Sequence, residues 1–284
     1  MKLYIAADSS CDITQEEAKE MGITVIPNEI HFGETIYHTG VDLTNDQFYE
    51  KLVNGDVLPK TSMITPAQYS QVMKEGLASA DYVIVIPLSR MLSGSYNSAL
   101  IAKDTFSLDE QKRIRVLDCL TVIAGQRIMI DEILKNKDDM EIDTLCDYIL
   151  TLSKRIRIYA TVGTLDYLFK GGRVSRIQYN LGRLINIKPV IKVIGGEVKV
   201  SAKAHGTKNA LKTQIEKLEK HEIDYNYPIY LMYGIDTELL DSLLKECENN
   251  DHINLENLKK VQIGPTIGTH VGPLAAAVIY IRKI

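Results

Sequence analysis

Short apolar runs, each followed by a polar turn and an amphipathic stretch, alternate along this chain. The first run, Leu3–Ala7, meets a polar segment, after which Thr14-Gln15-Glu16-Glu17 has the pattern of a capping box at a helix start. Tyr82–Leu88 is a second apolar and β-branched run, and the sequence after it predicts a helix over Tyr96–Phe106. A short strand, Arg115–Leu117, then precedes an apolar helix around Val122–Leu134. Such alternation predicts an α/β protein with a mostly parallel sheet.

The pattern changes after a predicted helix at Ile142–Arg155, which indicates that a second unit begins there. In this unit Pro189–Ile194 and Glu197–Ala202 flank Gly195-Gly196, and two glycines suit the tight turn of a hairpin. A hairpin joins antiparallel strands, so the second sheet is predicted to be mixed. The other predicted elements are Tyr159–Val162, Leu165–Phe169, Val174–Leu184, Asn209–Lys220, Ile229–Tyr233, Leu239–Glu248, Lys260–Ile263 and Ala276–Ile281.

The expected architecture is therefore a pair of α/β domains that share a close interface. The first covers residues 1–156 and has an α/β/α arrangement with a parallel sheet. The second covers residues 157–284 and has a mixed sheet. The length of 284 residues fits two domains of ordinary size, and no low-complexity linker separates them.

Composition and charge narrow the class of function. The chain is 45% hydrophobic and 25% charged, and 33 Lys and Arg against 37 Asp and Glu give a formal net charge of -4. A slightly acidic chain without a basic helix-turn-helix is not expected to bind nucleic acid or to regulate transcription. No apolar run approaches the about 20 residues that span a bilayer, and the four scattered cysteines form no disulfide or zinc pattern. We therefore expect a cytoplasmic protein with at most transient membrane contact.

Two hydroxyl-rich segments fall where an α/β sheet exposes the carboxyl ends of its strands, the usual place for a ligand. In Lys60-Thr61-Ser62 both hydroxyls precede a helix that Thr65 is expected to cap, so they either meet a ligand or face solvent. At Ser93-Gly94-Ser95 a turn leads into a helix whose first amides favour an anion, unless a serine only caps that helix. The G-x-S-x-G pattern of a hydrolase nucleophile is absent around Ser93.

Two further segments contribute a histidine and an arginine. His270 lies within Ile263–Pro273, where glycines and prolines indicate a rigid loop, and a lone histidine there is either structural or positioned for a ligand. At its unperturbed pKa of about 6.5, this histidine could tune the charge of a bound group. Arg173 follows two glycines, where it could grip an oxyanion or lie on the surface at a helix start. We find no metal-ligand spacing, Walker loop or dinucleotide motif, so no metal or cofactor is expected.

Together these segments resemble the DegV family, whose motifs occur in the same order over essentially the whole chain. The matching segments are Asp8-Ser9-Ser10-Cys11-Asp12, Lys60-Thr61-Ser62, Leu92-Ser93-Gly94-Ser95-Tyr96, Lys170-Gly171-Gly172-Arg173-Val174-Ser175 and Ile263–Pro273. Members of this family are bacterial two-domain proteins that bind a fatty acid. They present it to a kinase related to dihydroxyacetone kinases, which phosphorylates the carboxyl group for phospholipid synthesis. The resemblance thus implies a lipid-binding, non-catalytic subunit of a fatty acid kinase, with a long-chain acid such as palmitate as its ligand.

The resemblance also assigns roles to particular residues. The carboxylate of the fatty acid would contact Thr61, Ser62, Ser93, Gly94, Arg173 and His270. Arg176 would lie on the surface that meets the kinase, and the acyl tail would fill a tunnel between the domains. The chain departs from the usual family pattern at Met63-Ile64-Thr65, Ser201–Lys208 and Gly272-Pro273-Leu274, which concerns partner contacts and chain preference more than the head-group site.

Two alternative functions use the same side chains. A serine esterase or thioesterase would need Ser93 as nucleophile and His270 as base, but the spacing is wrong and no acidic third member is identified. A dihydroxyacetone-type binding subunit would instead capture a carbonyl group on a histidine. A fatty acid needs no catalytic motif, because about 14 buried methylenes at ~0.8 kcal/mol each supply affinity, and hydroxyls with one cation satisfy the carboxylate.

Overall fold

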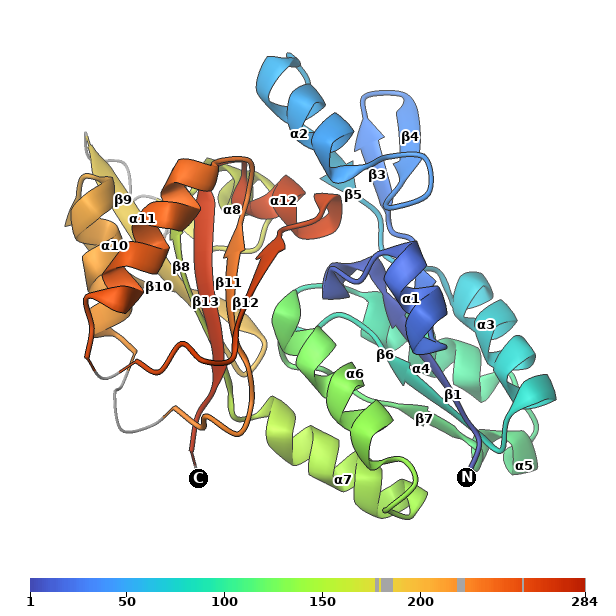
Figure 1. Ribbon diagram of the computed structural model, residues 1–284. Helices are drawn as coiled ribbons and strands as arrows, with labels where there is room; N and C mark the ends of the chain where they lie inside the picture. The colour runs from blue at the N-terminus through green and yellow to red at the C-terminus, as the bar shows by residue number, and fades with distance from the viewer. Residues whose placement is uncertain (177–178, 180–185, 219–222, 252, 284) are drawn as a thin grey trace.

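The computed structural model describes residues 1–176, 179, 186–218, 223–251 and 253–283. Within these residues the strands form three sheets, two of which stand side by side with the third above them (Figure 1). The first sheet is parallel, with the strand order β2-β1-β6-β7. Its strands are β1 (Leu3–Asp8), β2 (Thr24–Ile26), β6 (Tyr82–Ile86) and β7 (Ile114–Val116).

The first sheet is buried on both faces, as the near-continuous apolar run of β6 predicts. Ile84 and Ile86 pack on the face covered by α6, whereas Val83 and Val85 pack on the opposite face against α3 and α4. The helices of this part are α1 (Gln15–Met21), α3 (Pro66–Ser79), α4 (Ser95–Asp104), α5 (Leu108–Gln111), α6 (Ala124–Asn136) and α7 (Ile142–Ser153), with a 3-10 turn at Ser9–Cys11. The α/β fold with a parallel first sheet is confirmed.

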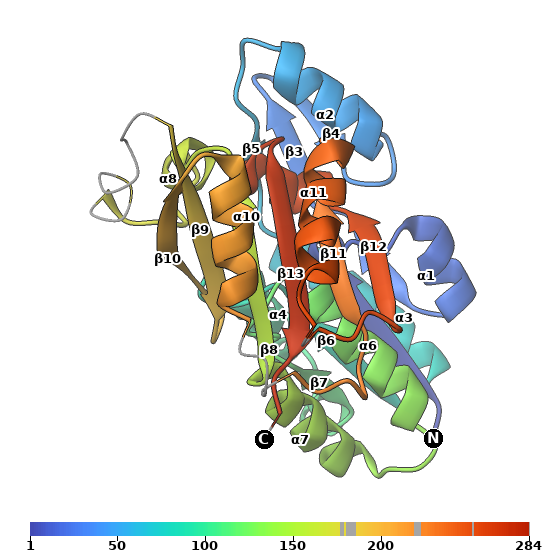
Figure 2. The same cartoon turned by 60° about the vertical axis from the view of Figure 1, so that its left-hand side comes forward.

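The second sheet is mixed, with the strand order β10-β9-β8-β13-β11-β12. Its β11–β12 pair is parallel, and the other neighbouring pairs are antiparallel. The strands are β8 (Ile156–Val162), β9 (Ile187–Ile194), β10 (Glu197–His205), β11 (Ile229–Tyr233), β12 (Leu258–Gln262) and β13 (Ala275–Ile281). Its helices are α8 (Asp166–Lys170), α10 (Thr207–Glu216), α11 (Thr237–Glu248) and α12 (Pro265–Val271). Figure 2 shows α10 and α11 on one face, which leaves the other face toward the first sheet.

The predicted hairpin joins β9 to β10 through Gly195 and Gly196, whose φ values of 62° and 84° are those of a tight hairpin turn. At the hairpin tip, the Ser89 hydroxyl donates to the carbonyl oxygen of Gly196 at 3.2 Å. The tip therefore joins the second sheet to the loop that follows β6. The second sheet begins with β8 at Ile156, next to the boundary expected after residue 156, and that division into domains stays a prediction.

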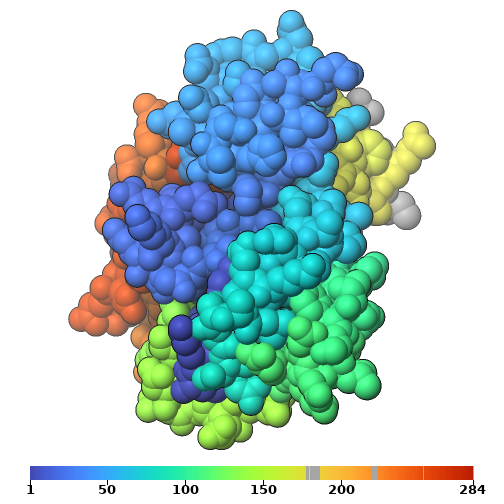
Figure 3. Space-filling model, turned by 90° about the vertical axis from the view of Figure 1, so that its right-hand side faces the viewer, coloured from blue at the N-terminus to red at the C-terminus, as the bar shows by residue number. Residues whose placement is uncertain are grey.

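A small third sheet was not predicted. It has the order β4-β3-β5 and consists of β3 (Glu29–Phe32), β4 (Thr35–His38) and β5 (Lys60–Thr61), with α2 (Asn45–Asn54) beside it. Ile30, Phe48 and Tyr49 are central to its own apolar core. In Figure 3 its blue atoms form the upper end of the molecule. The small sheet and α2 contact α12, which belongs to the half of the chain that forms the second sheet.

The expectation of a rigid loop at Ile263–Pro273 is wrong, because Pro265–Val271 forms helix α12. Pro265 occupies the first turn, where a missing N–H costs nothing, and Gly268 lets the helix pack closely on Phe48. The predicted helix Val174–Leu184 lies largely outside the described residues. Among the helices that the structure describes, none has the length and hydropathy needed to cross a bilayer.

Candidate functional site

A cavity of about 290 Å³ lies between the two large sheets, close to the lower end of the usual range for ligand pockets. It contains all six residues that the sequence singled out for a head group: Thr61, Ser62, Ser93, Gly94, Arg173 and His270. Its other walls are mainly apolar and come from both halves of the chain: Asn28, Met63, Leu88, Leu92, Val122, Ile123, Ile158, Ala160, Leu168, Ile191, Val193, Val198, Ile263, Thr266, Ile267, Val271, Ala275 and Ala277. Arg176 is exposed and is not among these residues.

The space arises from small side chains at the middle of the second sheet. Successive residues of a strand point to opposite faces, so Ala275 and Ala277 of β13 face the first sheet while Ala276 faces α10 and α11. Ala277 lies directly opposite Ala160 of β8 in the antiparallel register. Bulkier neighbours such as Ile191 line the sides of the cavity. The arrangement leaves an apolar hollow against the centre of the sheet.

Thr61 and His270 meet at the polar end of the cavity. Strand β5 carries Thr61 and helix α12 carries His270, and the Thr61 Oγ1 and His270 Nε2 atoms lie 2.9 Å apart. The His270 side chain is buried, with 9% of the residue exposed, and its Nδ1 atom is buried against Gly171 without a hydrogen-bond partner. Burial, with a smaller effect of nearby Arg173, lowers the pKa of His270 to about 3. The expectation that this histidine titrates near its usual pKa is therefore wrong, and it is neutral at physiological pH.

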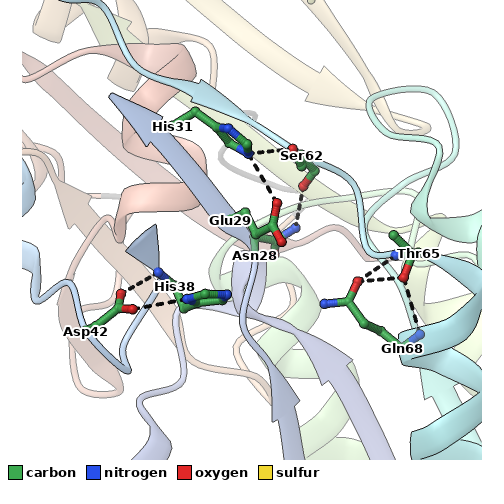
Figure 4. Close-up of polar contacts among 8 residues, drawn as sticks. All are labelled: Asn28, Glu29, His31, His38, Asp42, Ser62, Thr65 and Gln68. Carbon is green, nitrogen blue, oxygen red and sulfur yellow. Dashed lines mark hydrogen bonds and ion pairs between the residues drawn. The ribbon is translucent and has the colours of Figure 1, made fainter. Parts of the chain in front are cut away.

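Ser62 is held by residues of the small sheet, as Figure 4 shows. Its Oγ atom lies 2.8 Å from Nε2 of His31, and the same nitrogen lies 3.2 Å from a Glu29 carboxylate oxygen. A carboxylate oxygen accepts hydrogen bonds, so the contact with Glu29 is a hydrogen bond when this nitrogen carries a hydrogen. Nε2 has a position for one hydrogen, so Glu29 and Ser62 share the same nitrogen at the wall of the cavity.

Ser93 and Gly94 form the start of helix α4 at the wall of the cavity. The Ser93 hydroxyl oxygen accepts from the Ser95 amide at 3.2 Å and lies 2.9 Å from the Ser95 hydroxyl. Gly94 is the N-cap residue and provides no side-chain cap. Ser93 thus satisfies the first amide of the helix while the positive end of the helix dipole faces the same region. The capping and ligand-binding interpretations of this serine are therefore compatible.

Arg173 connects the two halves of the chain at the cavity. Its Nε donates to the carbonyl oxygen of Leu92 at 3.0 Å, and its Nη1 donates to the carbonyl oxygen of Gly171. Burial lowers the pKa of the guanidinium, which nevertheless stays charged because its ordinary pKa is so high. Among the described residues that line the cavity, Arg173 is the one with a permanent charge. The cavity therefore has the electrostatic character required to bind a single anion.

Two supporting groups of residues were not identified from the sequence. The Ser62 contacts with Glu29 and His31 depend on the pairing of β3 with β5, which local patterns do not show. Thr266 of α12 lines the cavity and lies 2.9 Å, hydroxyl to hydroxyl, from Ser9, which also donates to Asn28. The N-terminal motif that contains Ser9 was the available signal for this second group.

The contacts give no support to the esterase alternative. Within the described part of the chain, His270 Nε2 pairs with Thr61 and the Ser93 hydroxyl pairs with Ser95, so no hydrogen bond joins Ser93 to His270. Glu29 and Ser62 contact the same nitrogen of His31, whereas a catalytic triad needs the acid and the nucleophile on opposite ring nitrogens. In the same described part, no group of three or more His, Cys, Asp or Glu side chains is arranged to hold a metal ion.

Comparisons with known proteins agree with the motif order. The family model described as "Uncharacterised protein, DegV family" matches residues 2–283. A DegV domain-containing protein of Caldanaerobacter subterraneus subsp. tengcongensis is 31% identical over 284 residues, which cover 99% of both chains. Among solved structures, a fatty acid-binding DegV family protein from Thermus thermophilus has a TM-score of 0.86 at 25% identity and covers 99% of this chain and 100% of its own. A stearic acid-binding protein from Eubacterium ventriosum has a TM-score of 0.85 at 29% identity, with 99% and 98% covered. The chain therefore belongs to the DegV family.

Proposed function

We propose that this protein binds a long-chain fatty acid in the cavity between its two large sheets and places the carboxylate at the Thr61–His270 end. The observation that carries this proposal is a mainly apolar cavity whose polar end combines hydroxyl groups with one cation. The fatty acid-binding proteins of the same fold, from Thermus thermophilus and Eubacterium ventriosum, support it.

The chemistry of the polar end matches a carboxylate. A carboxylate accepts hydrogen bonds and donates none, so it needs donors and a counter-charge once it leaves water. Ser62 and Ser93 bring hydroxyl groups to the wall of the cavity, and a hydroxyl can turn its proton toward a carboxylate. Arg173 supplies one positive charge, and neutral His270 adds none. One cation for one carboxylate keeps the buried site electrically balanced.

Mass spectrometry tests the ligand assignment. Protein purified without added lipid should carry a long-chain fatty acid, because burial of the acyl chain gives slow release, and extraction followed by mass analysis identifies it. A bound molecule of triose mass would instead support the dihydroxyacetone-type alternative. Serine-directed fluorophosphonate should leave the intact protein unmodified, and labelling at Ser93 would contradict a pure binding role.

We further propose that the bound acid is presented in the cytoplasm to a fatty acid kinase related to dihydroxyacetone kinases, which forms the acyl phosphate for phospholipid synthesis. Arg176 supports a docking role for this part of the surface, since it is exposed and lies three residues after Arg173. In this proposal Arg173 faces the ligand and Arg176 faces the partner. The protein itself provides binding and orientation, and the chemical step belongs to the kinase.

Two matched variants separate these roles. Ser93→Ala should weaken palmitate binding about tenfold, since a hydrogen bond to a charged group contributes about 1.5 kcal/mol. Arg176→Ala should leave palmitate affinity unchanged. It should lower the rate of acyl phosphate formation when the concentration of the fatty acid-loaded variant is too low to saturate the kinase. Titration calorimetry measures the first effect and a reconstituted kinase assay the second. Unchanged phosphorylation with Arg176→Ala would remove this residue from the proposed docking surface.

A further inference from the structure

The cavity between the two large sheets has a second end, opposite the one where Thr61 and His270 meet. Helix α12, which carries His270, leads into the start of β13 at Ala275, so the polar end lies where β13 begins (Figure 1). Strand β8 is antiparallel to both β13 and β9, so β9 runs in the same direction as β13. The tip of the β9–β10 hairpin therefore lies away from the polar end.

Side chains that face the cavity change from small to large at the same level on two neighbouring strands. With increasing distance from the polar end, β13 presents Ala275, Ala277 and then Ile279, and on β8 Ala160 is followed by Ile158. The antiparallel register pairs Ala277 with Ala160 and Ile279 with Ile158. The hollow formed by the alanines therefore ends at the level of the two isoleucines.

Ile158 is the first member of a row of branched side chains that crosses three strands. Val193 of β9 pairs with Ile158, and Val198 of β10 pairs with Val193. All three residues line the cavity, and we call them the terminal row. From Ala275 to Val198 the path runs about 13 Å along the strands and about 14 Å across them. That diagonal is comparable to the length of an extended long-chain fatty acid.

The space beyond the terminal row is filled. Ile156 is the next residue of β8 on the same face; it is 2% exposed, packs on Gly125 of α6 and is not among the described residues that line the cavity. On the β10 side, the Ser89 hydroxyl donates to the carbonyl oxygen of Gly196, and a side chain at Gly196 would collide with Ser89. The hairpin tip thus closes the gap between the sheets next to the terminal row.

We propose that the terminal row sets the longest acyl chain that this protein accepts, with the methyl end of the fatty acid against Ile158, Val193 and Val198. This proposal deepens the proposed function and rests on it. Each methylene that fits in the cavity leaves water and adds affinity. A methylene that reaches the row must displace packed side chains, which costs free energy. Affinity therefore rises with chain length up to a limit and falls beyond it.

Competition among saturated fatty acids tests the terminal row. The delipidated full-length chain is incubated with an equimolar mixture of the even-numbered acids from myristate to behenate, and native mass spectrometry quantifies each bound acid. Ile158→Ala removes most of one side chain of the row, so the preferred acid should be about two carbons longer than for the parent chain. The bound ratio of that longer acid to the acid preferred by the parent should rise about tenfold, because two more methylenes are buried.

The matched control is Ile156→Ala, which makes the same truncation on the same face of β8 behind the row. It should leave the length preference unchanged, although both truncations lower stability. Ile158→Val is a milder second variant that should shift the preference in the same direction as Ile158→Ala, and it decides the question if Ile158→Ala does not fold.

An unchanged length preference in the folded Ile158 variants would overturn the role of the terminal row and leave fatty acid binding intact. An equal shift in Ile156→Ala would do the same, because the limit would then not lie at the row. If the parent chain binds none of the acids, the proposed function itself fails, and the terminal row fails with it.

Discussion

Replacing Ala277 with phenylalanine is expected to lower palmitate affinity about a hundredfold while the chain stays folded. Ala277 faces the cavity from the middle of β13, directly opposite Ala160. An aromatic ring there occupies the space of about four methylenes, and each excluded methylene forfeits ~0.8 kcal/mol of burial. The lost ~3 kcal/mol corresponds to about two orders of magnitude in the dissociation constant. Because the ring enters empty space, the ligand-free protein avoids the usual cost of overpacking.

Titration calorimetry of delipidated protein measures this effect, and thermal unfolding checks the fold. Ala67→Phe adds the same ring at an exposed position on α3 and should leave palmitate affinity unchanged. Undiminished binding by the folded Ala277→Phe variant would show that the acyl tail lies elsewhere.

Acidification is expected to destabilise the ligand-free protein through His270. The pKa of this side chain is about 3 in the folded chain, whereas it is about 6.5 in the unfolded chain. Between these two pKa values the unfolded state binds a proton that the folded state does not bind. The contribution of His270 to the free energy of unfolding is therefore fully present above pH 6.5 and is lost as the pH falls toward 3. The predicted loss is about 1.4 kcal/mol per pH unit within this window, or about 2 to 3 kcal/mol between pH 7 and pH 4.5.

Urea unfolding at pH 7 and pH 4.5 measures the difference in the free energy of unfolding. His270→Asn should reduce that difference by most of the predicted amount, whatever it does to stability at pH 7. His205→Asn removes an exposed histidine and serves as the control, which should keep the pH dependence of the parent chain. An identical pH dependence in the His270→Asn variant would contradict the buried, neutral imidazole.

Local patterns predicted most of the elements of the two large sheets. Strand β11 was predicted with its observed bounds, and the capping boxes at Thr14 and Thr65 are both present. The small sheet was missed because β5 has two residues and pairs with a strand about 30 positions earlier. Helix α12 was missed because the glycines and prolines in and around it are typical of turns. The helix packs closely on Phe48 at Gly268, and this tertiary contact is not visible in the local sequence. Short elements that depend on tertiary contacts leave little local signal.

For the candidate site, motif order identified the residues, and the fold shows how they meet. The structure places the six predicted head-group residues around one cavity, although their role in binding a carboxylate stays a prediction. The partners of Ser62 could not be predicted, because His31 reaches it across a strand pair. The pKa of His270 also depends on burial, which no local pattern reports. Sequence thus located the polar groups, and tertiary structure determined their hydrogen-bonding and ionisation states.

The head-group end of the cavity draws on both halves of the chain, with Thr61 and Ser62 on one side and Arg173 and His270 on the other. A ligand that contacts both sides favours the present separation of the two halves. By thermodynamic reciprocity, an interaction that favours this separation also raises ligand affinity. In the proposed function, a partner that separated the two halves would weaken fatty acid binding, so release of the ligand would need only a change in their separation.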